Sequence, residues 1–294
     1  MKTLVIGGTG TVGSQVVREL LARKAEVLVL TRNAEKEKAL PPGVRGIVGD
    51  LLDPGTVRSI FRGVEGVFLL TGLSTSEAHE GLMAVNGARM AGVKRIAFLS
   101  IHNVDQAPHL PHFGAKLPIE AAIKASGIPY TILRPNNFYQ NDYWFKDALL
   151  QAGVYPQPIG QKGLSRVDVR DIAELAAIAL TSVGHEGQTY NVVGPEVVTG
   201  PGTAAVWSKA LGREIRYGGD DMDAWEKQSL QYLPAWSVFD FRLMYEFFQK
   251  QGLQATREDI ERQTKVLGHA PRRFEDFARE TAEMWTKAPS GVTA

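Results

Sequence analysis

The chain opens with MKTLVIGGTGTVGSQVVRELLARKAEVLVLTR, residues 1–32, and this stretch decides the fold. A short apolar run at 3–6 stops at a glycine-rich turn, 7–13, and a second apolar run follows at 26–30. Between them, apolar residues recur at the spacing of one helix face, namely Val12, Val16, Val17, Leu20 and Leu21. The stretch therefore predicts a strand, a glycine turn, a helix and a second strand.

The glycines of this turn have separate expected tasks. Gly7 permits the tight turn out of the strand, Gly10 lets the backbone approach a bound group, and Gly13 lets the helix lie close to the strand. A pyrophosphate would then sit on the free N–H groups and the positive dipole end of the helix. Glycine-rich turns also occur for purely structural reasons, but the strand before and the helix after favour a dinucleotide site. Its predicted contacts are Gly7, Thr9, Gly10, Thr11, Val12 and Gly13.

The composition excludes several classes of protein. The 294 residues carry 33 Lys and Arg against 32 Asp and Glu, with no long basic run, so we expect no nucleic-acid partner. Cysteine is absent, which removes disulfides and thiolate chemistry and fits a reducing compartment. No run reaches membrane-spanning length, and the first apolar run is too short for a signal peptide. We therefore expect a cytosolic protein without a membrane partner.

Strand-like and helical patterns alternate as far as residue 134. The later strands are expected at 44–49, 66–70, 95–100 and 130–134, with helices at 53–61, 77–91 and 119–125. Strands that are apolar throughout indicate an α/β fold of the Rossmann type, a doubly wound parallel sheet with helices on both faces. Ligands bind beyond the carboxyl ends of such strands, which here are followed by Gly7–Gly13, Thr31–Arg32, Asp50–Leu51, Thr71–Gly72, Ser100 and Pro135–Phe138.

Beyond Tyr139 the chain is expected to be mostly helical, with one further strand at 188–193. The predicted helices lie at 141–152, 171–181, 202–211 and 237–250, after Thr256 and after Pro271. We expect an NAD(P)-binding domain at 1–153, to which 166–182 returns, and a smaller substrate or partner domain at 183–294 with 154–165. The tail, 287–294, is expected to be disordered.

With these elements in place, the chain resembles the NmrA-like family of atypical short-chain dehydrogenase/reductases. The resemblance is carried by Gly7-Gly8-Thr9-Gly10, Thr31-Arg32-Asn33, Gly49-Asp50-Leu51, His112-Phe113 with Lys116, Ser126–Pro135, Val169–Ala173 and Phe274–Phe277. The family contains reductases of quinones and dyes and also cofactor-sensing regulators. The resemblance implies a Rossmann domain that binds NADP and a small, mostly helical substrate domain over the cofactor cleft.

Arg32 indicates NADP, with NADPH preferred over NADH. By the resemblance it reads the 2'-phosphate, and an NAD site would instead need a carboxylate here to accept from the ribose 2'-OH. The alternative is a solvated loop arginine. Asp50 resembles the family's adenine-side residue, followed by Leu51, but it is equally explained as a turn former.

Lys116 and His112 are the candidate catalytic pair. By resemblance to the wider superfamily, Lys116 holds the nicotinamide ribose and lowers the pKa of a proton donor four residues earlier, usually Tyr. His112 takes that place here, and histidine titrates near neutrality. Pro118 suggests that a helix begins at 116–118 and leaves His112 on a loop, where it could simply cap backbone groups. Lys116 could likewise be a surface partner of Glu120.

The remaining candidates follow the fifth and sixth strands. Ser100 is either a substrate-facing hydroxyl or a group that closes the strand end. Pro135 and Asn137 would contact the cofactor. The aromatic residues beyond them would line a pocket for a flat, conjugated substrate, or would pack between domains: Phe138, Tyr139, Tyr143 and Trp144. His102, His109 and His112 lack a carboxylate at matching spacing, so we predict no metal.

Two functions from different classes are compatible with this sequence. The first is an NADPH-dependent reductase that transfers hydride directly to a small conjugated or aromatic acceptor, quinone-like or dye-like. The alternative is a non-catalytic NADP(H) redox sensor that regulates a protein partner. The sequence favours the reductase.

Overall fold

The computed structural model describes residues 1–287 and divides the chain into two compact units. Unit 1 comprises 1–135, 169–192 and 261–269, and unit 2 comprises the rest. These limits place 136–153 in unit 2, whereas the sequence suggested a domain boundary at 153, and that domain assignment stays a prediction. Nearly all of the tail expected to be disordered, from 288 on, lies outside the described residues.

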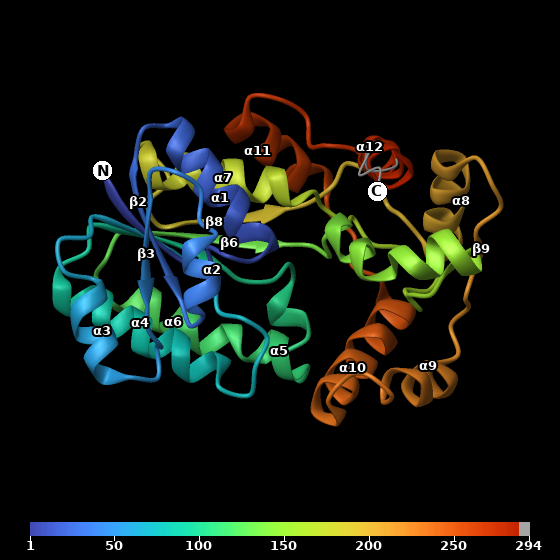
Figure 1. The fold of residues 1–294 in the computed structure, drawn as a ribbon, viewed down its shortest axis with the longest axis horizontal. Coiled ribbons are helices and arrows are strands. Elements are labelled where there is room, and N and C mark those ends of the chain that lie inside the picture. The colour runs from blue at the N-terminus through green and yellow to red at the C-terminus, as the bar shows by residue number, and fades with distance from the viewer. Residues whose placement is uncertain (288–294) are drawn as a thin grey trace, which may run out of the picture. The chain divides into compact units, whose positions relative to one another are not determined.

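Unit 1 is built on a seven-stranded parallel sheet (Figure 1). The spatial order is β3 (Val44–Val48), β2 (Glu26–Thr31), β1 (Lys2–Ile6), β4 (Gly66–Leu69), β5 (Arg95–Leu99), β6 (Tyr130–Pro135) and β8 (Gln188–Val192). In the register, Val5 of β1 lies between Val29 of β2 and Phe68 of β4. The strand order reverses between β1 and β4, which creates the switch point where such sheets bind ligands. The predicted α/β fold is confirmed.

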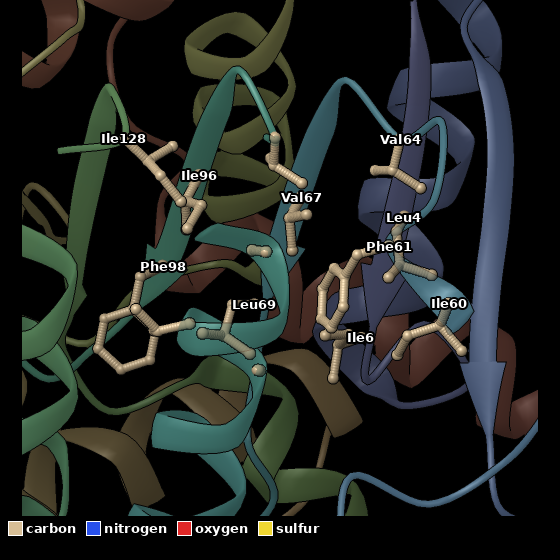
Figure 2. Close-up of a cluster of buried hydrophobic side chains, with 14 of the residues drawn as sticks. Leu4, Ile6, Ile60, Phe61, Val64, Val67, Leu69, Ile96, Phe98 and Ile128 are labelled. Carbon is tan, nitrogen blue, oxygen red and sulfur yellow. The ribbon is translucent and has the colours of Figure 1, made fainter. Parts of the chain in front are cut away.

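Helices cover both faces of this sheet (Figure 1). One face carries α1 (Thr11–Ala22) and α7 (Val169–Thr181), and the other carries α3 (Pro54–Ile60), α4 (Glu77–Ala91) and α6 (Lys116–Ala125). Figure 2 shows alternate strand residues, such as Leu4 and Ile6, pointing with Phe61 of the α3 end into one buried apolar cluster. Because both faces are buried, the central strands β1, β2, β4 and β5 are apolar along nearly their whole length, whereas the edge strands β3 and β8 carry polar residues.

Two short helices of unit 1 were not expected. The segment read as polar loop contains α2 (Ala34–Lys38), whose N-terminus is capped by the Asn33 side chain, 2.8 Å from the backbone N of Glu35. This helix has no buried residue, so it has no apolar periodicity to detect. His112 lies in α5 (Pro111–Gly114) and not on a loop, after a single 3₁₀ turn at Val104–Gln106.

Unit 2 is mostly helical, with a two-stranded parallel sheet of β7 (Val154–Tyr155) and β9 (Arg216–Tyr217). Its helices are α8 (Gly200–Leu211), α9 (Met222–Ser229), α10 (Ala235–Gln251), α12 (Phe274–Thr286) and the start of α11 (Arg257–Leu267), which continues into unit 1. The helix expected at 141–152 is instead a 3₁₀ helix, Tyr139–Phe145, followed by a π-helical turn, Ala148–Ala152. Within residues 1–287 no helix is both long and apolar enough to cross a membrane.

Candidate cofactor site

The N-terminus of α1 is left open for a ligand. Gly10 is its N-cap residue, and within the described chain no side chain caps it, whereas Asn33 and Asp53 cap α2 and α3. The N–H groups of the first turn, Thr11 to Gly13, therefore point outward at the positive end of a twelve-residue helix. This arrangement suits a pyrophosphate.

The glycines around this helix start serve different purposes. Gly7 has a φ of +80°, in the left-handed region that favours glycine. A β-carbon on Gly13 would lie 2.1 Å from the Gly7 carbonyl oxygen, so the helix can pack here only on glycine. A β-carbon on Gly10 would meet only that same oxygen, at 3.4 Å, which is an ordinary contact. The absence of a side chain at Gly10 is therefore not required by packing and instead leaves the cleft in front of it open.

That space is a cleft of about 570 Å³ at the switch point of the sheet. Its lining comes from the exits of β1 to β4 and from α2 and α4: Ile6, Gly7, Thr9, Gly10, Leu30, Thr31, Arg32, Asn33, Lys36, Gly49, Asp50, Leu51, Leu70, Thr71, Gly72, Leu73 and Glu80. Most cofactor residues named from the sequence in unit 1 thus share one cleft. In a dinucleotide site, the half built on the first three strands takes the adenosine end.

Two cations lie in this cleft. Arg32 and Lys36 both line it and are both exposed, and within residues 1–287 neither forms an ion pair. Lys36 was missed because it lies on α2, the helix without an apolar face. Asp50 also lines the cleft, and its Oδ1 accepts a hydrogen bond from the backbone N of Leu52 at 2.9 Å. It is therefore a turn former and a cleft residue at once.

Lys116 lies directly behind the cleft wall. It is the first residue of α6 and only 6% exposed, and its Nζ forms an ion pair with Glu77 of α4. The same Nζ donates to Thr71 Oγ1 at 3.1 Å, and Thr71 lines the cleft. The alternative of a surface pair with Glu120 is wrong, because Lys116 is buried on Glu77. Glu77 itself was not singled out from the sequence.

Ser100 and Glu120 form a second buried group. Ser100 Oγ donates to Glu120 Oε1 at 2.6 Å, and Arg134 binds both oxygens of Glu120, at 2.9 and 2.7 Å. Burial alone would raise the pKa of Glu120, but the hydrogen bonds from Arg134 and Ser100 outweigh it and hold this pKa below its usual value. Ser100 thus donates its only hydroxyl proton to Glu120. This hydrogen bond supports the interpretation of Ser100 as a group that closes the end of the strand. A role toward substrate stays a prediction.

His112 and Lys116 do not share one helix, because α5 ends at Gly114 and α6 begins at Lys116. The His112 ring is half-buried and packs edge-on against Phe113, with 4.8 Å between ring centroids. Ala115, between the two helices, keeps helical backbone angles, and its N–H donates to the Pro111 carbonyl at 3.0 Å. Proton donation by His112 stays a prediction.

The candidates beyond Pro135 belong to unit 2. Asn137 Oδ1 accepts from Arg166 Nε at 3.1 Å, and Arg166 donates to the Phe138 carbonyl at 2.9 Å. Tyr139 is fully buried against Phe274. The others are accessible, since Tyr143 is 39% exposed and Trp144 is 74% exposed. Their assignment to a substrate pocket, like the cofactor contacts of Pro135 and Asn137, stays a prediction.

A grouping that could hold a metal ion in the described chain consists of Asp171, Glu174 and His269, whose ligand atoms lie within 4.8 Å of one another. It includes none of the three histidines weighed from the sequence. His269 Nε2 and Glu174 Oε2 are already within hydrogen-bond distance, 3.0 Å. We assign no metal to it.

The model of the NmrA-like family matches residues 1–278. The chain belongs to the NmrA-like family. Among its relatives, an NAD(P)H azoreductase of Xenophilus azovorans is 33% identical over 284 residues, covering 95% of this chain and 97% of that protein. A (4-alkanoyl-5-oxo-2,5-dihydrofuran-3-yl)methyl phosphate reductase of Streptomyces griseus is 32% identical, covering 95% and 98%.

A solved structure similar to this chain is that of an NADPH-dependent quinone oxidoreductase of Escherichia coli complexed with NADPH. It has a TM-score of 0.85 at 25% identity, covering 95% of this chain and 99% of that one. The family resemblance read from the sequence is confirmed, and the fold that it implied extends over nearly the whole NmrA-like chain.

Proposed function

We propose that the chain is an NADPH-dependent reductase of a small conjugated or aromatic acceptor, such as a quinone or an azo dye. The observation that carries the proposal is the cleft at the switch point, where an uncapped helix N-terminus faces a space that also holds Arg32 and Lys36. The azoreductase and the quinone oxidoreductase support the reaction class, because both match nearly the whole chain.

The residues of the cleft fit NADPH better than NADH. NADPH carries a 2'-phosphate that the two cations can bind, and the exit of β2 offers no carboxylate that would repel it. The bare Gly10 leaves room for the pyrophosphate at the start of α1. The family resemblance assigns Lys116 to the nicotinamide ribose, and its hydrogen bond to Thr71, a residue of the cleft wall at the exit of β4, supports this assignment.

Reduction of the acceptor requires one hydride and one proton. When bound, NADPH supplies a hydride, and the acceptor takes it together with one proton, so that a quinone leaves as hydroquinone and NADP⁺ remains. The proton comes from His112 or from water. A cytosolic location is part of the proposal, because a chain without cysteine fits a reducing compartment.

The test measures NADPH oxidation with a panel of quinones, azo dyes and aldehydes, alongside the dissociation constants of NADPH and NADH. We expect turnover with at least one quinone or dye and tighter binding of NADPH. Tight NADPH binding without turnover of any acceptor would favour the redox-sensor alternative. Absence of NADPH binding would overturn both.

A further inference from the structure

A buried carboxylate of the cofactor cleft has no task in the proposed function. Glu80 of α4 lines the cleft and is only 7% exposed. Its Oε1 accepts from Ser76 Oγ at 2.6 Å and from Ser74 Oγ at 3.4 Å. Its other oxygen, Oε2, forms no hydrogen bond to any residue that the structure describes. This second oxygen is therefore available to a molecule in the cleft.

The charge of Glu80 limits what this molecule can offer. An ionised carboxylate only accepts hydrogen bonds, and it repels phosphate groups. The cleft already holds Arg32 and Lys36, which suit phosphates. A carboxylate nine-tenths buried in a site for an anionic cofactor therefore fits a neutral N–H or O–H donor of that cofactor, because such a hydrogen bond offsets the cost of its desolvation.

The position of the cleft narrows the donor to two groups. Its lining follows β1 to β4 and includes no residue from the exits of β5 or β6, so it corresponds to the adenosine half of a dinucleotide site. In the adenosine half of NADPH, the donors are the 6-amino group of adenine and the ribose 3'-OH. Leu51 and Leu73 line the same cleft with apolar side chains that suit the flat faces of a base.

We infer that Glu80 reads the adenine base of the cofactor, its free oxygen accepting a hydrogen bond from the 6-amino group. The inference rests on the proposed binding of NADPH and adds a specificity residue to it. In a base with an oxygen in place of the 6-amino group, a second hydrogen-bond acceptor would face the Glu80 carboxylate. The hydrogen bond would be lost and the two oxygens would repel each other. The cleft therefore selects adenine against hypoxanthine.

The test compares dissociation constants of the full chain for NADPH and for its 6-oxo analogue, reduced nicotinamide hypoxanthine dinucleotide phosphate. The parent should prefer NADPH by about tenfold or more, because a donor is lost and an acceptor faces the carboxylate. Glu80→Gln should bring the two constants within about threefold, since an amide can present either its carbonyl or its N–H group. A parent without preference, or an unchanged preference in Glu80→Gln, would overturn the inference.

Two control variants and two further outcomes separate the alternatives. Glu26→Gln makes the same chemical change at the start of β2, the opposite end of the strand from the cleft, and should leave the ratio unchanged. If Asp50→Asn removes the preference while Glu80→Gln keeps it, Asp50 reads the base and the inference is wrong. If Glu80→Gln weakens both cofactors equally, Glu80 binds the ribose hydroxyl and the inference is again wrong. A parent that binds neither cofactor instead refutes the proposed function.

Discussion

At the scale of the residue, Gly10 and Gly13, three positions apart in one turn, are needed for different reasons: one for the ligand and the other for the fold. Gly13 is required by the protein, because a β-carbon there would lie 2.1 Å from the Gly7 carbonyl oxygen. Gly10 is required by nothing within the described chain, since its β-carbon would make only an ordinary contact. The sequence predicted both tasks, and the structure supplies the distances that distinguish them.

Gly10→Val should therefore abolish binding of NADPH and NADH while the protein stays folded, because its side chain would enter the cleft and not the core. The measurement is the cofactor-induced rise in the temperature of thermal unfolding, which the parent should show and the variant should lack. Gly13→Ala is the contrasting variant and should lower the unfolding temperature without any cofactor. Cofactor stabilisation retained in Gly10→Val would refute the placement of the pyrophosphate.

The two cleft cations should set the choice between NADPH and NADH. A charge-assisted hydrogen bond to phosphate contributes about 1.5 to 3 kcal/mol, roughly ten- to a hundredfold in affinity. Arg32→Ala and Lys36→Ala should each weaken NADPH by about tenfold or more and change NADH little. Lys38→Ala is the matched control, because Lys38 lies on the same helix but pairs with Glu35 at 2.8 Å. Equal dissociation constants of the parent for NADPH and NADH would contradict the assignment.

At the scale of the element, the sequence predicted those helices and strands whose burial requires apolar side chains. The central strands were found because burial on both faces makes them apolar throughout, and α1 was found because its apolar side chains recur at the period of a helix. Helix α2 escaped detection because it buries nothing, and α5 because it has only four residues. A helix was expected at 141–152, but side-chain spacing does not determine whether such a segment is 3₁₀, α or π.

Helices α4 and α6 are joined by the buried pair of Glu77 and Lys116, which no local pattern predicts because its partners are distant in the sequence. Removing one partner leaves an uncompensated buried charge, at a cost of about 3 to 5 kcal/mol, whereas replacing both by apolar groups is often nearly neutral. Glu77→Met and Lys116→Met should thus each destabilise the protein strongly, and the double variant much less than their sum. The measurement is the free energy of urea unfolding, and simple additivity would show that the pair is not coupled.

At the scale of the whole molecule, the topology gathers residues that the sequence scatters. Gly7, Arg32, Asp50 and Thr71 follow four different strands, and one parallel sheet brings them to one cleft. These positions could be predicted because strand exits of a parallel sheet share an edge. The positions of Lys36 and Glu80 could not be predicted in this way, because both residues lie on helices. They line the cleft only because of how α2 and α4 pack on the sheet.

The stability of the whole chain should depend on pH through Glu120. Its folded-state pKa lies below the unfolded value of 4.5, because the hydrogen bonds from Arg134 and Ser100 outweigh the opposing effect of burial. The contribution of this carboxylate is therefore fully present above about pH 4.5 and is lost as the pH falls through the lower, folded-state pKa. Glu120→Gln should lower the urea midpoint at pH 7, and the gap to the parent should close in acid. Glu26→Gln changes an exposed carboxylate and should leave the urea midpoint close to that of the parent at every pH. A difference in midpoint between Glu120→Gln and the parent that stays constant from pH 7 to about pH 3 would contradict the predicted pH dependence.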